Sequence, residues 1–184
     1  MLIRAGRLHV AFLGRLPGTT LYSDIVRHPN NEPIPGVLAF RPDGSLLYVN
    51  AESVFDAVLA RLASQPTGSV RLVVCDLSAA AHLDLAGVGV LRKLHATLEG
   101  QGIRLAVAGP HGEVRDLLRR EGFADLVEGV ARIATLEAIL ATEEASKTGI
   151  GAGVNAPPSL EPRRGTSADT GMSDTIITLS REPG

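Results

Sequence analysis

The stretch VCDLSAAAHLDLAGVGVL, residues 74–91, places polar side chains where an apolar run ends and a helical pattern begins. Asp76 closes the apolar run, Ser78 follows in a loop of small residues, and Asp84 precedes the helical pattern. Free backbone N–H groups and the helix dipole converge at such junctions, which in α/β proteins hold a phosphate, a metal, a nucleotide or a partner protein. The loop from Asp76 to Gly87 is therefore the candidate functional site.

The same side chains also have structural uses. Asp84 is well placed to cap the following helix, because its carboxylate can accept hydrogen bonds from backbone N–H groups one turn further on. Asp76 and Ser78 can cap or brace the same loop, and such residues in turns are more often caps than catalysts. Gly87 and Gly89 permit close packing of the helix start onto the sheet without any ligand, and one G-x-G pair is weak evidence for a nucleotide.

The sequence contains no complete pattern for a metal site or a catalytic nucleophile. His82 and Asp84 stand two residues apart and offer two ligands, whereas the other histidines are scattered without paired spacing: His9, His28, His95 and His111. There is no G-x-S-x-G elbow, and Cys75 lies within the apolar run without an activating partner. We expect no metal, no cofactor and no catalysis. A small hydrolase or phosphotransferase that uses Asp76 or Asp84 is the alternative from the enzyme class.

The bulk composition narrows the class of protein further. The 184 residues carry a formal net charge of −2 with no basic cluster, so we expect no binding of nucleic acid. A single cysteine excludes a disulfide framework and is typical of a reducing cytosol. No stretch reaches the ~18–20 consecutive apolar residues of a membrane span, and the first residues lack the apolar region of a signal peptide. We therefore expect a soluble, cytoplasmic chain.

Strand and helix patterns alternate around the candidate site, and this alternation predicts the fold class. Apolar runs predict strands at residues 7–14, 37–40, 46–49, 70–77, 103–109 and 126–130, and helical spacing predicts helices near residues 54–62, 85–98, 114–118 and 136–140. The Asp43-Gly44 pair predicts that the strands at 37–40 and 46–49 form a β-hairpin. We expect a single α/β domain, with a mixed, mostly parallel sheet, an N-terminal β-hairpin and about four helices packed against it.

The composition changes after residue 144. Residues 145–184 are rich in Gly, Pro, Ser and Thr and show no period, which predicts a disordered tail. The glycines of GIGAG, residues 149–153, resemble part of a nucleotide loop, but no strand precedes them, so a linker is expected. Only the run at residues 175–179 has the composition of a strand. The predicted organisation is a lead-in at residues 1–36, a domain at 37–144 and the tail.

Two motifs resemble a known family. DLSAAAHLDLAGVGVL and, after a helix, GIRLAVAGPHGEVRDLLRREGF resemble the STAS domain, from about His9 to Leu140. This domain is shared by bacterial anti-sigma-factor antagonists and by the cytoplasmic C-terminal region of SulP-type sulfate/anion permeases. In addition, residues 7–52, RLHVAFLG through YVNAE, resemble the segment that joins the last membrane helix of a SulP permease to its STAS domain. Stand-alone antagonists generally lack that segment, so the resemblance favours the permease branch.

The resemblance also points to one replaced residue. In the antagonist branch, a Ser or Thr just before the helix glycine is phosphorylated by a partner kinase that is also the anti-sigma factor. The matching position here, between Leu85 and Gly87, is Ala86, which has no hydroxyl to accept a phosphoryl group. Ser78 matches the Ser of the preceding DLS element, not the acceptor. We therefore expect the architecture of the switch without phosphorylation at this site.

The function that the resemblance implies is a non-enzymatic regulatory and interaction module of a SulP-type sulfate/anion transporter, at the inner face of the cell membrane. Its partner would be the membrane domain of such a permease, in cis or in trans, or another cytoplasmic protein. Nothing in the sequence resembles a P-loop, and binding of a guanine nucleotide and a homodimer are left open. The alternative is a free-standing module like an anti-sigma-factor antagonist, without the phospho-acceptor.

The permease resemblance begins almost at Met1, with no membrane helices before it. Three explanations are open: the chain is the C-terminal piece of a split or truncated permease, its start codon has been misplaced, or it is a free-standing module.

Overall fold

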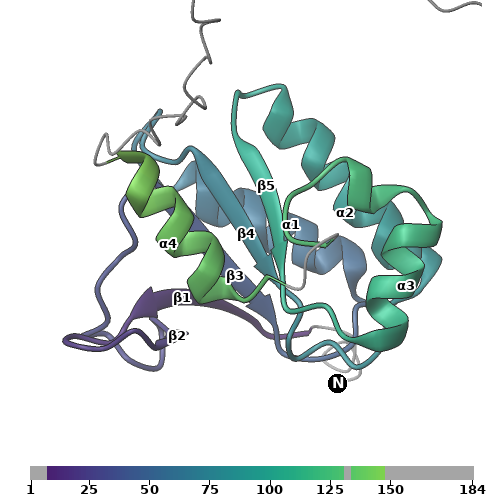
Figure 1. Cartoon of the computed structure of the whole chain (residues 1–184), viewed down its shortest axis with the longest axis horizontal. Helices are drawn as coiled ribbons and strands as arrows, with labels where there is room; N and C mark the ends of the chain where they lie inside the picture. Colours follow the sequence, from purple (N-terminus) through teal and green to yellow (C-terminus); the bar gives the residue numbers. More distant parts are fainter. Residues whose placement is uncertain (1–7, 131–133, 148–184) are drawn as a thin grey trace, which may run out of the picture. The chain divides into compact units, whose positions relative to one another are not determined.

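In the computed structural model, which describes residues 8–130 and 134–147, a five-stranded mixed sheet separates two layers of helices (Figure 1). The strands are β1 (Val10–Arg15), β2 (Tyr22–Asp24), β3 (Val37–Pro42), β4 (Leu72–Asp76) and β5 (Arg104–Ala108), in the order β2-β1-β3-β4-β5. β1 is antiparallel to both β2 and β3, whereas β3, β4 and β5 are parallel. The predicted fold class, a single α/β domain with a mostly parallel mixed sheet, is confirmed.

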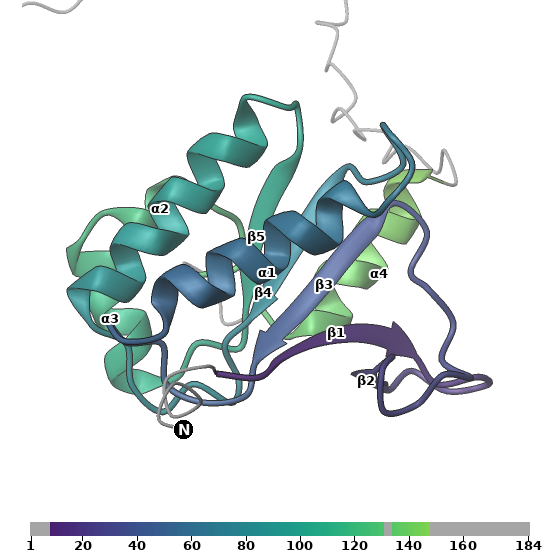
Figure 2. The same ribbon diagram turned by 180° about the vertical axis from the view of Figure 1, so that it is seen from behind.

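Helices cover both faces of this sheet. They are α1 (Ala51–Ala63), α2 (Leu85–Glu99), α3 (Gly112–Arg120) and α4 (Leu136–Lys147), with the short 3-10 helix η1 (Phe123–Asp125) after α3. α1 and α2 lie side by side on one face and α4 lies on the other (Figures 1 and 2). Gly122, at a left-handed φ of 67°, follows α3 and lets the chain turn into η1.

Strand alternation divides the core into two clusters. Residues such as Phe40, Val73 and Cys75 pack beneath α1 and α2, whereas their neighbours Ala39 and Val74 pack beneath α4. All five residues of β4 are buried, as the continuous apolar run predicts for a strand covered on both faces.

An ion-pair cluster fixes α4 to the amino ends of the parallel strands. The buried Glu143 of α4 pairs with Arg104 at the start of β5, and its other oxygen lies 3.5 Å from Arg71, which precedes β4. The last residues of α4 therefore lie at the edge of the sheet where β4 and β5 begin.

The predicted hairpin at residues 37–49 is wrong. The first half is β3, but residues 46–49 form no strand; Leu46 instead makes one parallel bridge to Leu83. The backbone N–H of Leu46 donates to the carbonyl of His82 at 3.1 Å, so this apolar segment joins the loop before α2 instead of turning back on β3. The N-terminal hairpin is formed by β1 and β2, and β2 lies in a segment that looked like turns alone.

The predicted strand at 126–130 is also wrong, because that segment contributes only one bridge, between Glu128 and Ala106. The helix α4 continues to Lys147, three residues beyond the predicted end of the domain at 144. The rest of the predicted tail, with the runs at 149–153 and 175–179, and residues 1–7 of the lead-in lie outside the described residues.

Candidate interaction site at the carboxyl edge of the sheet

Asp84 organises the edge of the sheet where β4 ends and α2 begins. It is the N-cap of α2, with an extended backbone, and its Oδ1 accepts a hydrogen bond from the N–H of Gly87 at 2.8 Å. Its Oδ2 accepts from the N–H of Tyr48 at 2.9 Å, and its own N–H donates to the carbonyl of Leu46 at 3.3 Å. The capping role expected from the sequence is present, and the same carboxylate also holds the loop that precedes α1.

Gly87 makes this close contact between the two loops sterically feasible. A Cβ at this position would lie 2.6 Å from the carbonyl oxygen of Leu46 and 2.5 Å from Cδ1 of Leu83. The expected need for a glycine therefore applies here, although the close neighbour is the loop at Leu46 and not the sheet. At Gly89 a Cβ would meet nothing within 4 Å, so the expected close packing at this second glycine is wrong.

Asp76 braces the start of the loop. Its buried carboxylate accepts hydrogen bonds from Arg41 on β3, with Oδ2 at 2.8 Å from Nε and 2.7 Å from Nη2. Its Oδ1 accepts from the N–H of Ser78 at 2.9 Å. Because Arg41 supplies a fork of two donors, it compensates the buried negative charge. Sequence reasoning found Asp76 and Ser78 but missed Arg41.

Ala86 and Ser78, the two positions compared above as phospho-acceptors, are both exposed on this edge. Ala86 lies in the first turn of α2, between Leu85 and Gly87 and two residues after the N-cap Asp84. Ser78 lies in the loop after β4, and its carbonyl oxygen is 3.1 Å from Nε2 of His111. A protein that docks on this edge meets a methyl group at position 86.

Comparison with known proteins places this geometry in a family. The model of the STAS domain matches residues 28–138, more than half of the chain. The chain belongs to the STAS domain family. Two of the most similar relatives are sulfate transporters of Stylosanthes hamata: High affinity sulfate transporter 2, 28% identical over 134 residues, and Low affinity sulfate transporter 3, 30% identical over 136 residues. Each match covers 69% of this chain but only 20% and 21% of the relatives, so the chain spans about a fifth of their length.

Solved structures show the same fold. The murine Slc26a9 anion transporter superposes on 74% of this STAS domain chain and 22% of its own, with a TM-score of 0.64 and 21% identity. The STAS domain of a SulP transporter from Vibrio cholerae superposes on 67% of this chain and 93% of its own, with a TM-score of 0.51 and 15% identity. Over the described residues, none of the helices combines the length and the apolarity that crossing a membrane requires.

The STAS domain exposes large apolar side chains around Asp84. Tyr48 and Val49, in the loop before α1, are 76% and 55% exposed, and Leu85, in the first turn of α2, is 65% exposed. The hydrogen bonds of Asp84 hold these two segments next to each other. Sequence reasoning missed Tyr48 and Val49, because it assigned them to a strand. The only indication in the sequence was that the carboxylate of Asp84 has a second oxygen, which can accept a hydrogen bond from another segment.

Two other groups with reactive side chains lie near this edge, Cys75 and His82. Burial in β4 raises the pKa of the Cys75 thiol well above its ordinary value, and the charge of Asp76 raises it further, so this thiol resists ionisation. The exposed His82 has Glu113 as a neighbour at 4.0 Å. Within residues 8–130 and 134–147, no three His, Cys, Asp or Glu side chains gather in a way that would hold a metal ion.

Proposed function

We propose that this STAS domain is a non-enzymatic regulatory and interaction module of a SulP-type sulfate or anion transporter, and that it works at the inner face of the cell membrane. The proposed partner is the membrane domain of such a permease, in cis or in trans. The names of the sulfate transporters that match the chain support this assignment, as does the resemblance of residues 7–52 to the segment that follows the last membrane helix of these permeases.

One observation carries the proposal that this edge docks a protein. The carboxylate of Asp84 holds Tyr48 beside the first turn of α2, so that exposed apolar side chains from two segments lie at one edge. Soluble domains seldom keep several large apolar side chains exposed together unless another surface covers them. The Arg and Lys side chains of α2 are both engaged within the domain, because Arg92 donates to the carbonyl of Glu121 and Lys93 pairs with Glu52 at 2.8 Å. This arrangement favours a protein surface over anionic lipid as the partner.

The test is binding of the full chain to the detergent-solubilised membrane domain of a SulP sulfate transporter. Tyr48→Asp and Leu85→Asp place a carboxylate in the exposed apolar patch. We expect each to raise the Kd about tenfold or more, as substitutions in the centre of an interface do. Leu126→Asp is the matched control, because Leu126 is 44% exposed on a different part of the domain. Unchanged affinity in both edge variants, or an equal loss in the control, contradicts the proposed surface.

The alternative function, a free-standing module like an anti-sigma-factor antagonist, is tested by phosphorylation of the loop. Because Ala86 has no hydroxyl, incubation of the chain with an anti-sigma-factor kinase and ATP should add no phosphate to residues 76–87, as read by peptide mass spectrometry. Ala86→Ser supplies an exposed hydroxyl at the same place and is the positive control. Phosphate on Ser78 of the unsubstituted chain would show that the switch had been aligned wrongly.

A further inference from the structure

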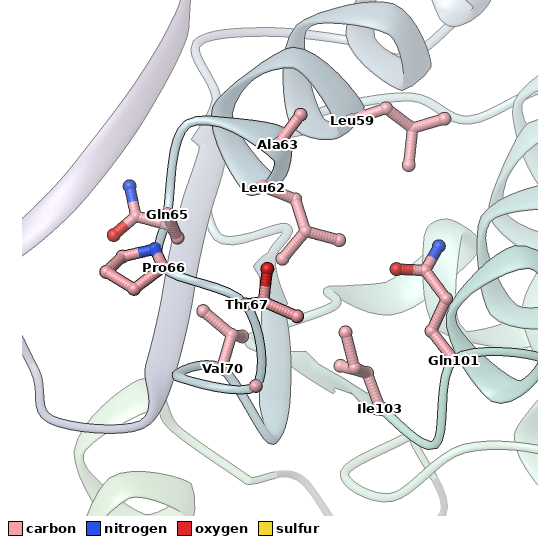
Figure 3. Close-up of a pocket in the computed structure, with 10 residues that line it drawn as sticks. Leu59, Leu62, Ala63, Gln65, Pro66, Thr67, Val70, Gln101 and Ile103 are labelled. Carbon is pink, nitrogen blue, oxygen red and sulfur yellow. The ribbon is translucent and has the colours of Figure 1, made fainter.

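A surface hollow lies at the opposite end of the parallel strands from Asp84. The last two turns of α1, the loop that leads to β4 and the turn before β5 line an open cavity of about 610 Å³ (Figure 3). Leu59 and Leu62 of α1 form one wall, and Val70 and Ile103, which lie just before β4 and β5, form the other. These four side chains are only partly buried, so their apolar surface remains accessible in the cavity.

None of the described residues that line the cavity is charged. Its remaining lining residues are apolar or neutral: Ala63, Gln65, Pro66, Thr67, Gly68 and Gln101. An ionised ligand would lose water there without gaining a counter-charge, which is unfavourable. A volume of several hundred Å³ with apolar walls and few polar groups is typical of sites for small uncharged molecules.

The polar groups at the mouth offer an acceptor. The amide nitrogen of Gln101 donates to the carbonyl of Thr97 at 3.3 Å, near the end of α2, which leaves the amide oxygen for other partners. Figure 3 shows that this oxygen points across the cavity toward the hydroxyl of Thr67. A donor placed between them can therefore bond to either oxygen.

From this geometry we infer that the cavity binds a small, uncharged, largely apolar molecule that carries one hydrogen-bond donor. The apolar part contacts Leu59, Leu62, Val70 and Ile103, and the donor bonds to Oε1 of Gln101. This site is distinct from the edge around Asp84, so its occupancy does not depend on the proposed transporter partner.

The test uses N-phenyl-1-naphthylamine, a neutral aromatic probe with one N–H donor whose fluorescence rises in apolar surroundings. We expect the full chain to bind it saturably with one site, and 1-decanol to displace it more effectively than decanoate at neutral pH. Thr67→Glu and Gln101→Glu, both at exposed positions, should raise the Kd of the probe about tenfold or more, because each brings a carboxylate to the mouth. Thr19→Glu, in the exposed turn after β1, is the matched control and should leave the Kd unchanged.

Three results would overturn the inference. The first is the absence of saturable binding to the unsubstituted chain. The second is binding that both carboxylate variants leave unchanged while their circular dichroism matches that of the unsubstituted chain. The third is displacement by decanoate as effectively as by decanol, which would show that the site does not select against charge. If one variant unfolds, the other variant and the comparison of decanol with decanoate still test whether the cavity binds an uncharged molecule.

Discussion

The carboxylate of Asp84 connects two segments that are 36 residues apart, because its Oδ2 accepts from the N–H of Tyr48 at 2.9 Å while its Oδ1 caps α2. One side chain thus sets both the start of a helix and the position of the loop before α1. The exposed apolar side chains that we propose as a docking surface are held in place by this residue.

Asp84→Ala is expected to lower the free energy of unfolding by about 1–2 kcal/mol, the usual cost of losing an N-cap. Loss of the bond to Tyr48 adds to this cost. Asp84→Asn keeps an acceptor oxygen and should lose less. Urea unfolding followed by circular dichroism measures both variants. An Ala variant as stable as the unsubstituted chain would mean that Asp84 does not hold the two segments together.

Substitutions of the two glycines of α2 by alanine form a matched pair of variants with opposite expected effects. In Gly87→Ala the new methyl meets the backbone oxygen of Leu46, which cannot move without shifting the loop, so we expect a loss of about 1–3 kcal/mol. Gly89→Ala enters open space in a helix and should stabilise the domain by about 0.5–1 kcal/mol. Thermal unfolding of the two variants should therefore show Tm shifts of opposite sign. Shifts of the same sign would contradict the close approach at Gly87.

Breaking the ion pair between Arg41 and Asp76 should lower the free energy of unfolding more than the substitutions above. Arg41→Met removes both donors from a carboxylate whose side chain is only 4% exposed, so we expect a loss of about 3 kcal/mol in the free energy of unfolding. The double variant Arg41→Met with Asp76→Asn removes the uncompensated charge and should recover part of that loss. Arg120→Met, at an exposed position on α3, is the control and should stay within about 0.5 kcal/mol of the unsubstituted chain. Urea unfolding curves of the four chains give the comparison.

The lowered pKa of Asp24 predicts that the stability of the domain falls at acidic pH. Burial of this carboxyl favours its neutral form, but hydrogen bonds from His9 and from the N–H of Val26, together with the charges of His9 and Arg27, outweigh burial and lower its pKa below the ordinary 3.8. A carboxyl whose pKa is lower in the folded state contributes stability that is complete above the unfolded pKa and is lost as the pH falls through the folded pKa.

Asp24→Asn should therefore destabilise the domain at neutral pH, and the difference from the unsubstituted chain should shrink as the pH falls below about 4. Urea unfolding over a series of pH values measures this difference. Asp116→Asn, at an exposed side chain on α3, is the matched control. A difference that stays constant down to about pH 2 would show that the pKa of Asp24 is not lowered by folding.

Local patterns were sufficient to predict much of this fold. The continuous apolar run predicted β4, and the spacing of Val90, Leu91, Leu94 and Leu98 predicted the buried stripe of α2. Asp84 was identified as a cap because capping depends on residues only a few positions away.

The errors arose where bonds join distant segments. Residues 46–49 have the composition of a strand, but the hydrogen bonds of Leu46 go to the loop at His82 and Asp84, which no local pattern reveals. Arg41 was missed for the same reason, because its partner Asp76 lies 35 residues further along the chain.

The most direct test of the central claim is to locate the protein in native cells. An antibody raised to residues 37–140 is used on immunoblots of separated membrane and soluble fractions, before and after an alkaline carbonate wash of the membranes. A module of a SulP-type transporter predicts a band mainly in the membrane fraction. The wash removes that band if the module binds the membrane domain in trans and retains it if the two belong to one chain. A band near 19.3 kDa that is confined to the soluble fraction would contradict the account.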